Sequence, residues 1–164
     1  MTPIVRRALG ALAALAVALG GGIVAAAPAP ASGPLTPVLT GIRTGLHPGF
    51  DRVVLDLSGP QNMTTTYQFA DELTQDPTGD VFWLTGADFV AVVVHGAAAH
   101  DDAGNATYLG ADRFRTRDLG NVMAVGVNGD FEATLSIGIG TRHRSWVRVF
   151  TLGSPTRVVI DVGH

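Results

Sequence analysis

Two short segments of this chain carry charged residues at matching positions. Residues 51–57 read Asp-Arg-Val-Val-Leu-Asp-Leu, and residues 156–162 read Thr-Arg-Val-Val-Ile-Asp-Val, so both contain Arg-Val-Val-aliphatic-Asp-aliphatic. A guanidinium group binds carboxylates and phosphates in a fork geometry. The charged residues of this repeat are therefore candidate binding residues: Arg52, Asp56, Arg157 and Asp161.

A second set of arginines alternates with other residues further along the chain. Arg113, Arg115 and Arg117 are separated by Phe114 and Thr116, so on a strand all three project from one face. They are candidates for holding the carboxylates or phosphates of a polymer. The simpler interpretation is a solvent-facing strand whose arginines pair with aspartates. Another group follows at positions 142, 144 and 148.

Aromatic rings supply another kind of contact, since they can stack on sugar faces. Trp83, Trp146, Tyr67 and Tyr108 are the candidates, but we expect most of them in the core or at its edge.

Catalytic and metal chemistry finds little support in the residues. His95 and His100 lie near Asp101 and Asp102, but their spacing matches no known ligand pattern, and a solvated polar loop explains them equally well. The chain has no cysteine and no Gly-x-Ser-x-Gly elbow, and its two glutamates have no suggestive context. We expect no catalytic residue, metal or cofactor.

The repeat segments must be β-strands, because β-branched residues dominate both. Alternation places three aliphatic residues of each copy on a core face and the arginine and aspartate on the other face. If the two strands pair antiparallel with Val54 opposite Val159, Arg52 faces Asp161 and Asp56 faces Arg157. If they lie in different sheets, each outer face keeps an arginine and an aspartate ~13 Å apart, which suits a polymer.

The rest of the chain also reads as strands and turns. Turn residues recur every eight to twelve positions, which predicts an all-β fold, a small antiparallel β-sandwich. Further strands are expected at 63–69, 81–84, 88–95 and 145–152. Asn128-Gly129 predicts a hairpin turn between strands at 121–127 and 131–139. The run 90–94 is apolar on both faces, which predicts a central strand.

The N-terminal region has the composition of an export signal. Arg6 and Arg7 precede an apolar, alanine-rich stretch, so residues 1–31 are expected to be a removable signal helix with its cleavage region, and 32–37 a short linker. An uncleaved anchor is the alternative, and it would be the only membrane contact. Without Arg6 and Arg7, nine arginines stand against fourteen acidic residues, which gives no support for nucleic-acid binding.

Both ends of the region 38–164 resemble a known family. The segments 41–45, 47–56, 129–132, 148–152 and 155–162 are similar to the AMIN-like domain of secreted actinobacterial envelope proteins, which is itself related to the AMIN domain of cell-wall amidases. The resemblance implies a β-sandwich without enzymatic activity that places proteins at the envelope, with peptidoglycan as the ligand. Residues 1–164 depart from that family pattern, since they contain no lipobox cysteine and we expect no catalytic domain within them.

The leading hypothesis is therefore a secreted, cell-wall-associated, non-enzymatic module that binds peptidoglycan or another wall glycan. The alternative is a protein-interaction domain that docks on an envelope enzyme or divisome component by an exposed strand edge. A small hydrolase is a third reading, with no residue to support it.

Overall fold

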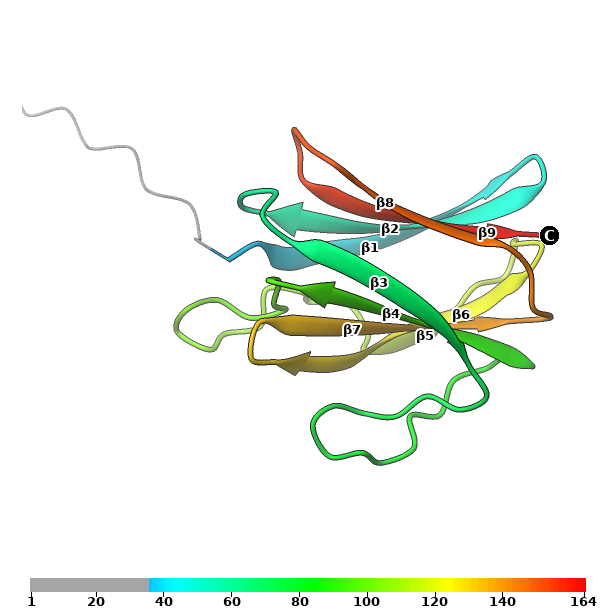
Figure 1. Cartoon of the computed structure of the whole chain (residues 1–164), viewed down its shortest axis with the longest axis horizontal. Helices are drawn as coiled ribbons and strands as arrows, with labels where there is room; N and C mark the ends of the chain where they lie inside the picture. The colour runs from blue at the N-terminus through cyan, green and yellow to red at the C-terminus, as the bar shows by residue number, and fades with distance from the viewer. Residues whose placement is uncertain (1–35) are drawn as a thin grey trace, which may run out of the picture. The chain divides into compact units, whose positions relative to one another are not determined.

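The computed structural model describes residues 36–164, which form nine β-strands in two antiparallel sheets (Figure 1). The all-β prediction is confirmed, and the described residues hold no helix that could cross a membrane. The predicted signal at 1–31 and most of the predicted linker at 32–37 lie outside the described residues.

The first sheet has the order β1-β2-β9-β8, and the second has the order β3-β4-β7-β6-β5. The first sheet contains β1 (Val38–His47), β2 (Phe50–Ser58), β9 (Arg157–Gly163) and β8 (Val147–Leu152). The second contains β3 (Thr64–Ala70), β4 (Asp88–His95), β7 (Thr134–Thr141), β6 (Val122–Phe131) and β5 (Arg113–Arg115). The two sheets stack as layers, with β8, β2, β1 and β9 in one of them (Figure 1).

Aliphatic side chains from both sheets form the core between the layers. The two repeat segments are β2 and β9, and their aliphatic triplets are buried as predicted: Val53, Leu55, Leu57, Val158, Ile160 and Val162. The facing sheet contributes alternate residues of β4 and β7. Burying each such side chain contributes ~1.5–3 kcal/mol. The predicted central position of the 90–94 run is also confirmed, because β4 lies between β3 and β7.

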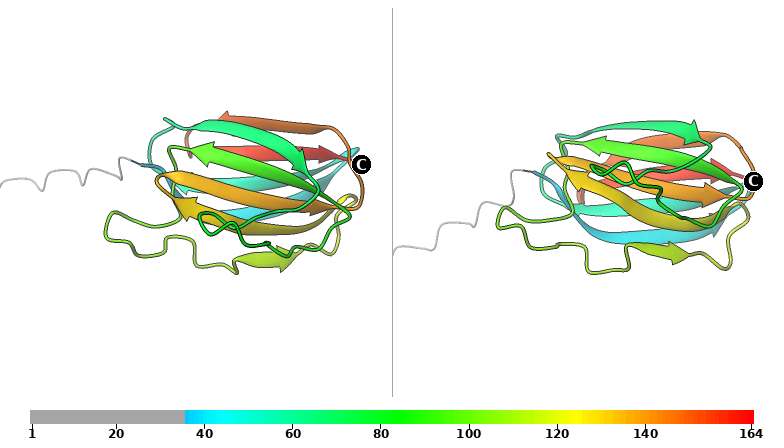
Figure 2. Two further views of the ribbon diagram at one scale, coloured as in Figure 1. Left: turned by 60° about the horizontal axis from the view of Figure 1, so that its bottom comes forward. Right: turned by 90° about the horizontal axis from the view of Figure 1, so that it is seen from below.

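Residues 71–87 cover part of the outer face of the second sheet (Figures 1 and 2). Leu73 and Phe82 are buried there, against Gly138 and Gly126, where a Cβ atom would lie 2.6 Å from Leu73 and 2.7 Å from Phe82. Glycine is needed at both positions because the covering segment comes so close. The strand predicted at 81–84 is wrong: only Val81 forms a bridge, with Thr74.

The predicted hairpin exists, but its turn lies elsewhere. β6 continues through Asn128-Gly129 with an irregular register, and the chain reverses at Glu132-Ala133, whose φ angles are 47° and 54°. Asn128-Gly129 instead contacts the covering segment, residues 71–87. The Asn128 side chain donates to the Thr74 carbonyl, and a Cβ at Gly129 would lie 2.7 Å from Asp76.

Candidate functional site

The two repeat strands are neighbours, and their charged residues meet. β2 pairs antiparallel with β9, with Val54 opposite Val159, Arg52 opposite Asp161 and Asp56 opposite Arg157. The paired arrangement considered from the sequence is therefore confirmed, and the arrangement in different sheets is wrong. The repeat lies on the outer face of the first sheet.

Asp161 is the centre of this outer face. Arg52 donates two hydrogen bonds to its carboxylate, at 2.7 and 2.9 Å, and Arg148 of β8 donates a third at 2.5 Å. The Asp161 side chain is fully buried, whereas those of Arg52 and Arg148 are 30% and 60% exposed. Burial raises the pKa of Asp161, but the arginines outweigh that effect and hold this pKa below its ordinary value.

In the other half of the repeat, the side chains do not pair with the residues that lie opposite them on the neighbouring strand. Asp56 lies opposite Arg157, but its carboxylate accepts two hydrogen bonds from Arg43 of β1, at 2.6 and 2.7 Å. The hydrogen bond from Arg43 is the main cause that lowers the pKa of Asp56. Arg157 donates to the Pro155 carbonyl instead. Most of the charge of the repeat is thus neutralised within the protein.

The second arginine set lies at an edge of the sandwich. Arg113 and Arg115 are on β5, while Arg117 lies two residues past its end, and all three are exposed as the alternation predicted. Arg113 lies 4.2 Å from the Phe82 ring and donates to the Trp83 carbonyl. Among the described residues, none of these three arginines forms an ion pair with a carboxylate, so the predicted pairing with aspartates is wrong for this set. In the other group it is confirmed for Arg144, near Asp71 and Asp88, and for Arg148, on Asp161.

A groove of about 430 Å³ runs beside these arginines. It is lined by residues 44–46 of β1 and 114–119, and we call it the β5 groove. Figure 2 shows β5 at the edge of its sheet, on the side where β1 ends the other sheet. An adjoining hollow of about 160 Å³ lies between Trp83 and Arg115. The two hollows share Phe114 and Arg115, so they form one continuous surface.

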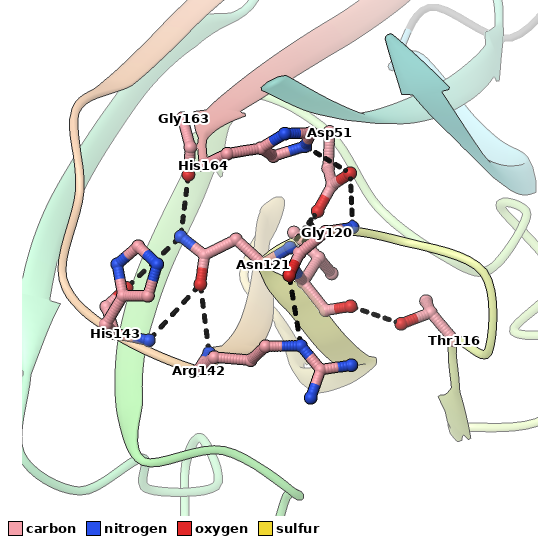
Figure 3. A network of polar contacts seen from close by, with 9 residues as sticks. Asp51, Thr116, Gly120, Asn121, Arg142, His143, Gly163 and His164 are labelled. Carbon is pink, nitrogen blue, oxygen red and sulfur yellow. Dashed lines mark hydrogen bonds and ion pairs between the residues drawn. The ribbon is translucent and has the colours of Figure 1, made fainter. Parts of the chain in front are cut away.

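A buried polar network fixes the segment that carries Arg117 (Figure 3). The Asp51 carboxylate accepts hydrogen bonds from the backbone N–H groups of Gly120, Asn121 and Val122 at 3.0, 2.6 and 2.8 Å. His164 Nε2 lies 3.0 Å from the same carboxylate. Burial raises the pKa of Asp51, but these hydrogen bonds together lower it below its ordinary value.

Asn121 extends this network to the first sheet and to the turn before β8. Its side-chain amide donates to the Gly163 and His143 carbonyls, and its oxygen accepts from the N–H groups of Arg142 and His143 (Figure 3). Sequence reasoning missed this network. One signal was present: Asp51 has the same parity as Val53, so it is a carboxylate at a core-facing position.

Three of the four candidate aromatic platforms are exposed, against expectation. Trp83 is 76% exposed, Trp146 is 51% and Tyr67 is 44%, and Tyr108 alone of the four is partly buried. Trp83 lines the hollow that adjoins the β5 groove. Trp146 lies on the outer face of the first sheet, against Gly163 and Phe50. Both tryptophans are therefore available to a ligand.

The histidine cluster considered for a metal is not assembled. His100 Nδ1 lies 2.6 Å from Asp130 rather than bonding Asp101 or Asp102. Asp101 instead accepts hydrogen bonds from Asn105 and Ala103 within its own loop. Within residues 36–164, no three histidine or carboxylate side chains are grouped as a metal site.

The fold and its exposed groups define the class, a two-sheet antiparallel β-sandwich with arginines and tryptophans presented at one edge and on one face. The family model of the AMIN-like domain matches residues 37–164, and the chain belongs to that family. The resemblance read from both ends of the sequence is thus confirmed at the level of the family. No curated protein and no solved structure matches the chain.

Proposed function

We propose that this protein is a secreted, non-enzymatic module of the cell envelope that binds peptidoglycan or another wall polymer through the β5 groove. The AMIN-like family supports the envelope role. The observation that carries the binding proposal is the set of exposed arginines at 113, 115 and 117, which have no carboxylate partner among the described residues.

The chemistry of the groove suits an anionic polymer. Guanidinium groups that have no carboxylate partner among the described residues can each bind a carboxylate or phosphate in bidentate geometry. Wall polymers are rich in both groups. The neighbouring Trp83 ring adds a flat apolar surface, and Leu46 and Phe114 add apolar contact inside the groove.

The test is retention on purified peptidoglycan sacculi. We expect the double variant Arg115→Gln/Arg117→Gln to lose most of its retention. The control Arg43→Gln/Arg144→Gln removes two formal charges from exposed arginines outside the groove, and thermal unfolding checks its fold because both arginines form ion pairs. Equal retention by the two double variants would contradict the proposal. Arg113 is left in place because it packs on Phe82.

Arg52→Ala is a poor probe of binding. It removes two of the three arginine hydrogen bonds from the buried Asp161 carboxylate, so lost retention would report an altered sheet as well as a lost contact. Arg157→Ala is cleaner, and we expect it to retain wall binding, because Arg157 lies outside the β5 groove.

Export is part of the proposal and has its own test. A signal in residues 1–31 followed by a linker at 32–37 would deliver the domain at 38–164 to the wall. Fractionation of cells expressing the full chain should place the protein in the wall and medium fractions, with a mature N-terminus near residue 32. A product that keeps Met1 in the membrane fraction would instead support the uncleaved anchor.

The second candidate function is docking on an envelope protein. It is favoured by β5, a three-residue strand whose outer edge has no strand partner among the described residues. An extended peptide can add to such an edge through main-chain hydrogen bonds. Crosslinking in cells separates the two functions: one dominant protein partner without retention on sacculi favours docking.

A further inference from the structure

We infer that the outer face of the first sheet holds a second binding surface, where the sugar rings of an acidic glycan stack on aromatic side chains. The surface is built on a row of rings that crosses the end of the sheet: His47 on β1, Phe50 on β2 and Trp146 beside β8, hereafter the aromatic row. His47 pairs with Phe50, Phe50 pairs with Gly163, and the Gly163 N–H donates to the Trp146 carbonyl at 2.9 Å.

The rings of the row touch one another. The His47 and Phe50 rings are stacked with centroids 4.8 Å apart and planes 5° apart, and the Phe50 and Trp146 centroids are 6.1 Å apart. Gly163 leaves the space that the indole of Trp146 occupies, because a Cβ there would overlap its Nε1 atom. The row crosses four strands, which is roughly 14 Å at ~4.8 Å per strand interval.

Arginines lie directly beside the row. The next row across the sheet carries Arg52, Asp161 and Arg148, and the Arg52 guanidinium lies 5.2 Å from the Phe50 ring centroid. Two guanidinium groups share one buried carboxylate, so this part of the face keeps a net positive charge. Arg148 is the more exposed of the two and can accept a further anion.

This combination identifies the ligand class. A sugar ring places its C–H face on an aromatic ring, and its hydroxyl or carboxylate groups then reach a donor at the side of that ring. Trp146 is half exposed, while His47 and Phe50 are partly buried beside it. An accessible indole flanked by positive charge fits an acidic sugar better than it fits an aliphatic protein surface. The face is also open, whereas the outer face of the second sheet is partly covered by residues 71–87.

The aromatic row is distinct from the β5 groove, although it rests on the same proposed function. Trp83 lines the hollow that adjoins the groove, Trp146 belongs to the row, and the chain has two tryptophans in all. Each single-tryptophan variant thus reports one surface by its fluorescence. Trp83→Phe leaves Trp146 as the reporter, and Trp146→Phe leaves Trp83.

The experiment titrates both variants with two soluble tetrasaccharides, one of galacturonic acid and one of N-acetylglucosamine. We expect a saturable fluorescence change in Trp83→Phe, with tighter binding of the acidic sugar; a separate change in Trp146→Phe would report the β5 groove. Adding Arg148→Gln to Trp83→Phe should lower the affinity for the acidic sugar about tenfold, the ratio that 1.4 kcal/mol gives. The affinity for the neutral sugar should stay nearly unchanged. Arg52 still pairs with Asp161 in that variant, and thermal unfolding checks its fold.

A change in Trp83 fluorescence alone, or in neither variant, would overturn the inference. Self-association through Trp146 in sedimentation, without a sugar response, would assign the row to a protein contact and also overturn it. The proposed function has its own, separate test. It fails if the Arg115→Gln/Arg117→Gln variant is retained on sacculi as well as its control. A Trp146 response would survive that failure.

Discussion

At the residue scale, Asp161 is held by two arginines that are not equivalent. Arg52 donates two hydrogen bonds from a mostly buried position, while Arg148 donates from a more exposed one. A buried carboxylate that loses its main partner keeps the cost of its desolvation. Arg52 is therefore the structural partner, and Arg148 is free to serve a ligand as well.

We expect Arg52→Ala to lower the free energy of unfolding by about 2 kcal/mol, since hydrogen bonds to charged groups are worth that much. Arg148→Ala should cost less than about 1 kcal/mol, because exposed ion pairs contribute little. Urea denaturation of the two variants at neutral pH measures the difference. Equal losses would contradict the unequal roles assigned to the two arginines.

Asp51 makes folding depend on acid pH. Its pKa in the folded protein is lower than in the unfolded chain, so its contribution to stability is complete above the unfolded value, near pH 4. That contribution is lost as the pH falls below 4 and the folded carboxylate takes up a proton. Asp51→Asn should therefore be destabilised at pH 7 by about 2 kcal/mol, because its amide cannot accept all three backbone N–H groups.

The difference between the wild type and Asp51→Asn should shrink as the pH falls from 5 to 2, measured by urea denaturation at each pH. Asp102→Asn changes an exposed carboxylate and is the matched control. A gap that stays constant down to pH 2 would show that the carboxylate charge is not what the three backbone groups require.

At the element scale, alternation predicted more than turn chemistry did. The parity of β2 and β9 predicted the correct core face, and the antiparallel one of the two arrangements left open had the correct register. The Asn-Gly signal failed because it is a local rule, and a distant segment decides this position. Thr74 and Asp76 dock on Asn128-Gly129, and no pattern within residues 121–139 contains that information.

The hairpin turn lies at two residues for which its backbone geometry is unfavourable. Glu132 and Ala133 both have positive φ angles, which cost an L-residue roughly 1–2 kcal/mol each. The Ala133 carbonyl accepts hydrogen bonds from Gly96 and Ala97, so the turn is held from outside. We expect Glu132→Asn/Ala133→Gly to raise the free energy of unfolding by about 1 kcal/mol, because Asn-Gly suits this turn.

Urea denaturation measures that gain, and Glu132→Gln is the control, since it keeps the unfavourable φ and should gain nothing. A double variant no more stable than the wild type would mean that contacts from Gly96 and Ala97 already offset the strain.

At the scale of the whole molecule, the two candidate surfaces meet on one strand. Leu46 lines the β5 groove and is 59% exposed, while the next residue, His47, belongs to the aromatic row. The arginines and tryptophans could be identified from the sequence, but not the fact that the β5 groove and the aromatic row share strand β1. They share it because β1 is the edge of its sheet on the side where β5 ends the other.

A polymer that passes around the β1 edge can touch both surfaces at once. The second contact is then intramolecular, and such linkage raises overall affinity by about 10²–10⁴ over either site alone. We expect Arg115→Gln/Arg117→Gln and Trp146→Phe each to lower the affinity for sacculi at least about tenfold. Each change should leave the affinity of the other surface for a short soluble sugar unaltered, because a tetrasaccharide reaches one surface only.

Binding isotherms on sacculi, compared with fluorescence titrations of the tetrasaccharides, measure this difference. The combined variant should lose all saturable retention. The surfaces act independently if each variant loses no more affinity for sacculi than it loses for a soluble tetrasaccharide at the altered surface. In that case the shared strand β1 would bring the two sites together without letting one polymer use both.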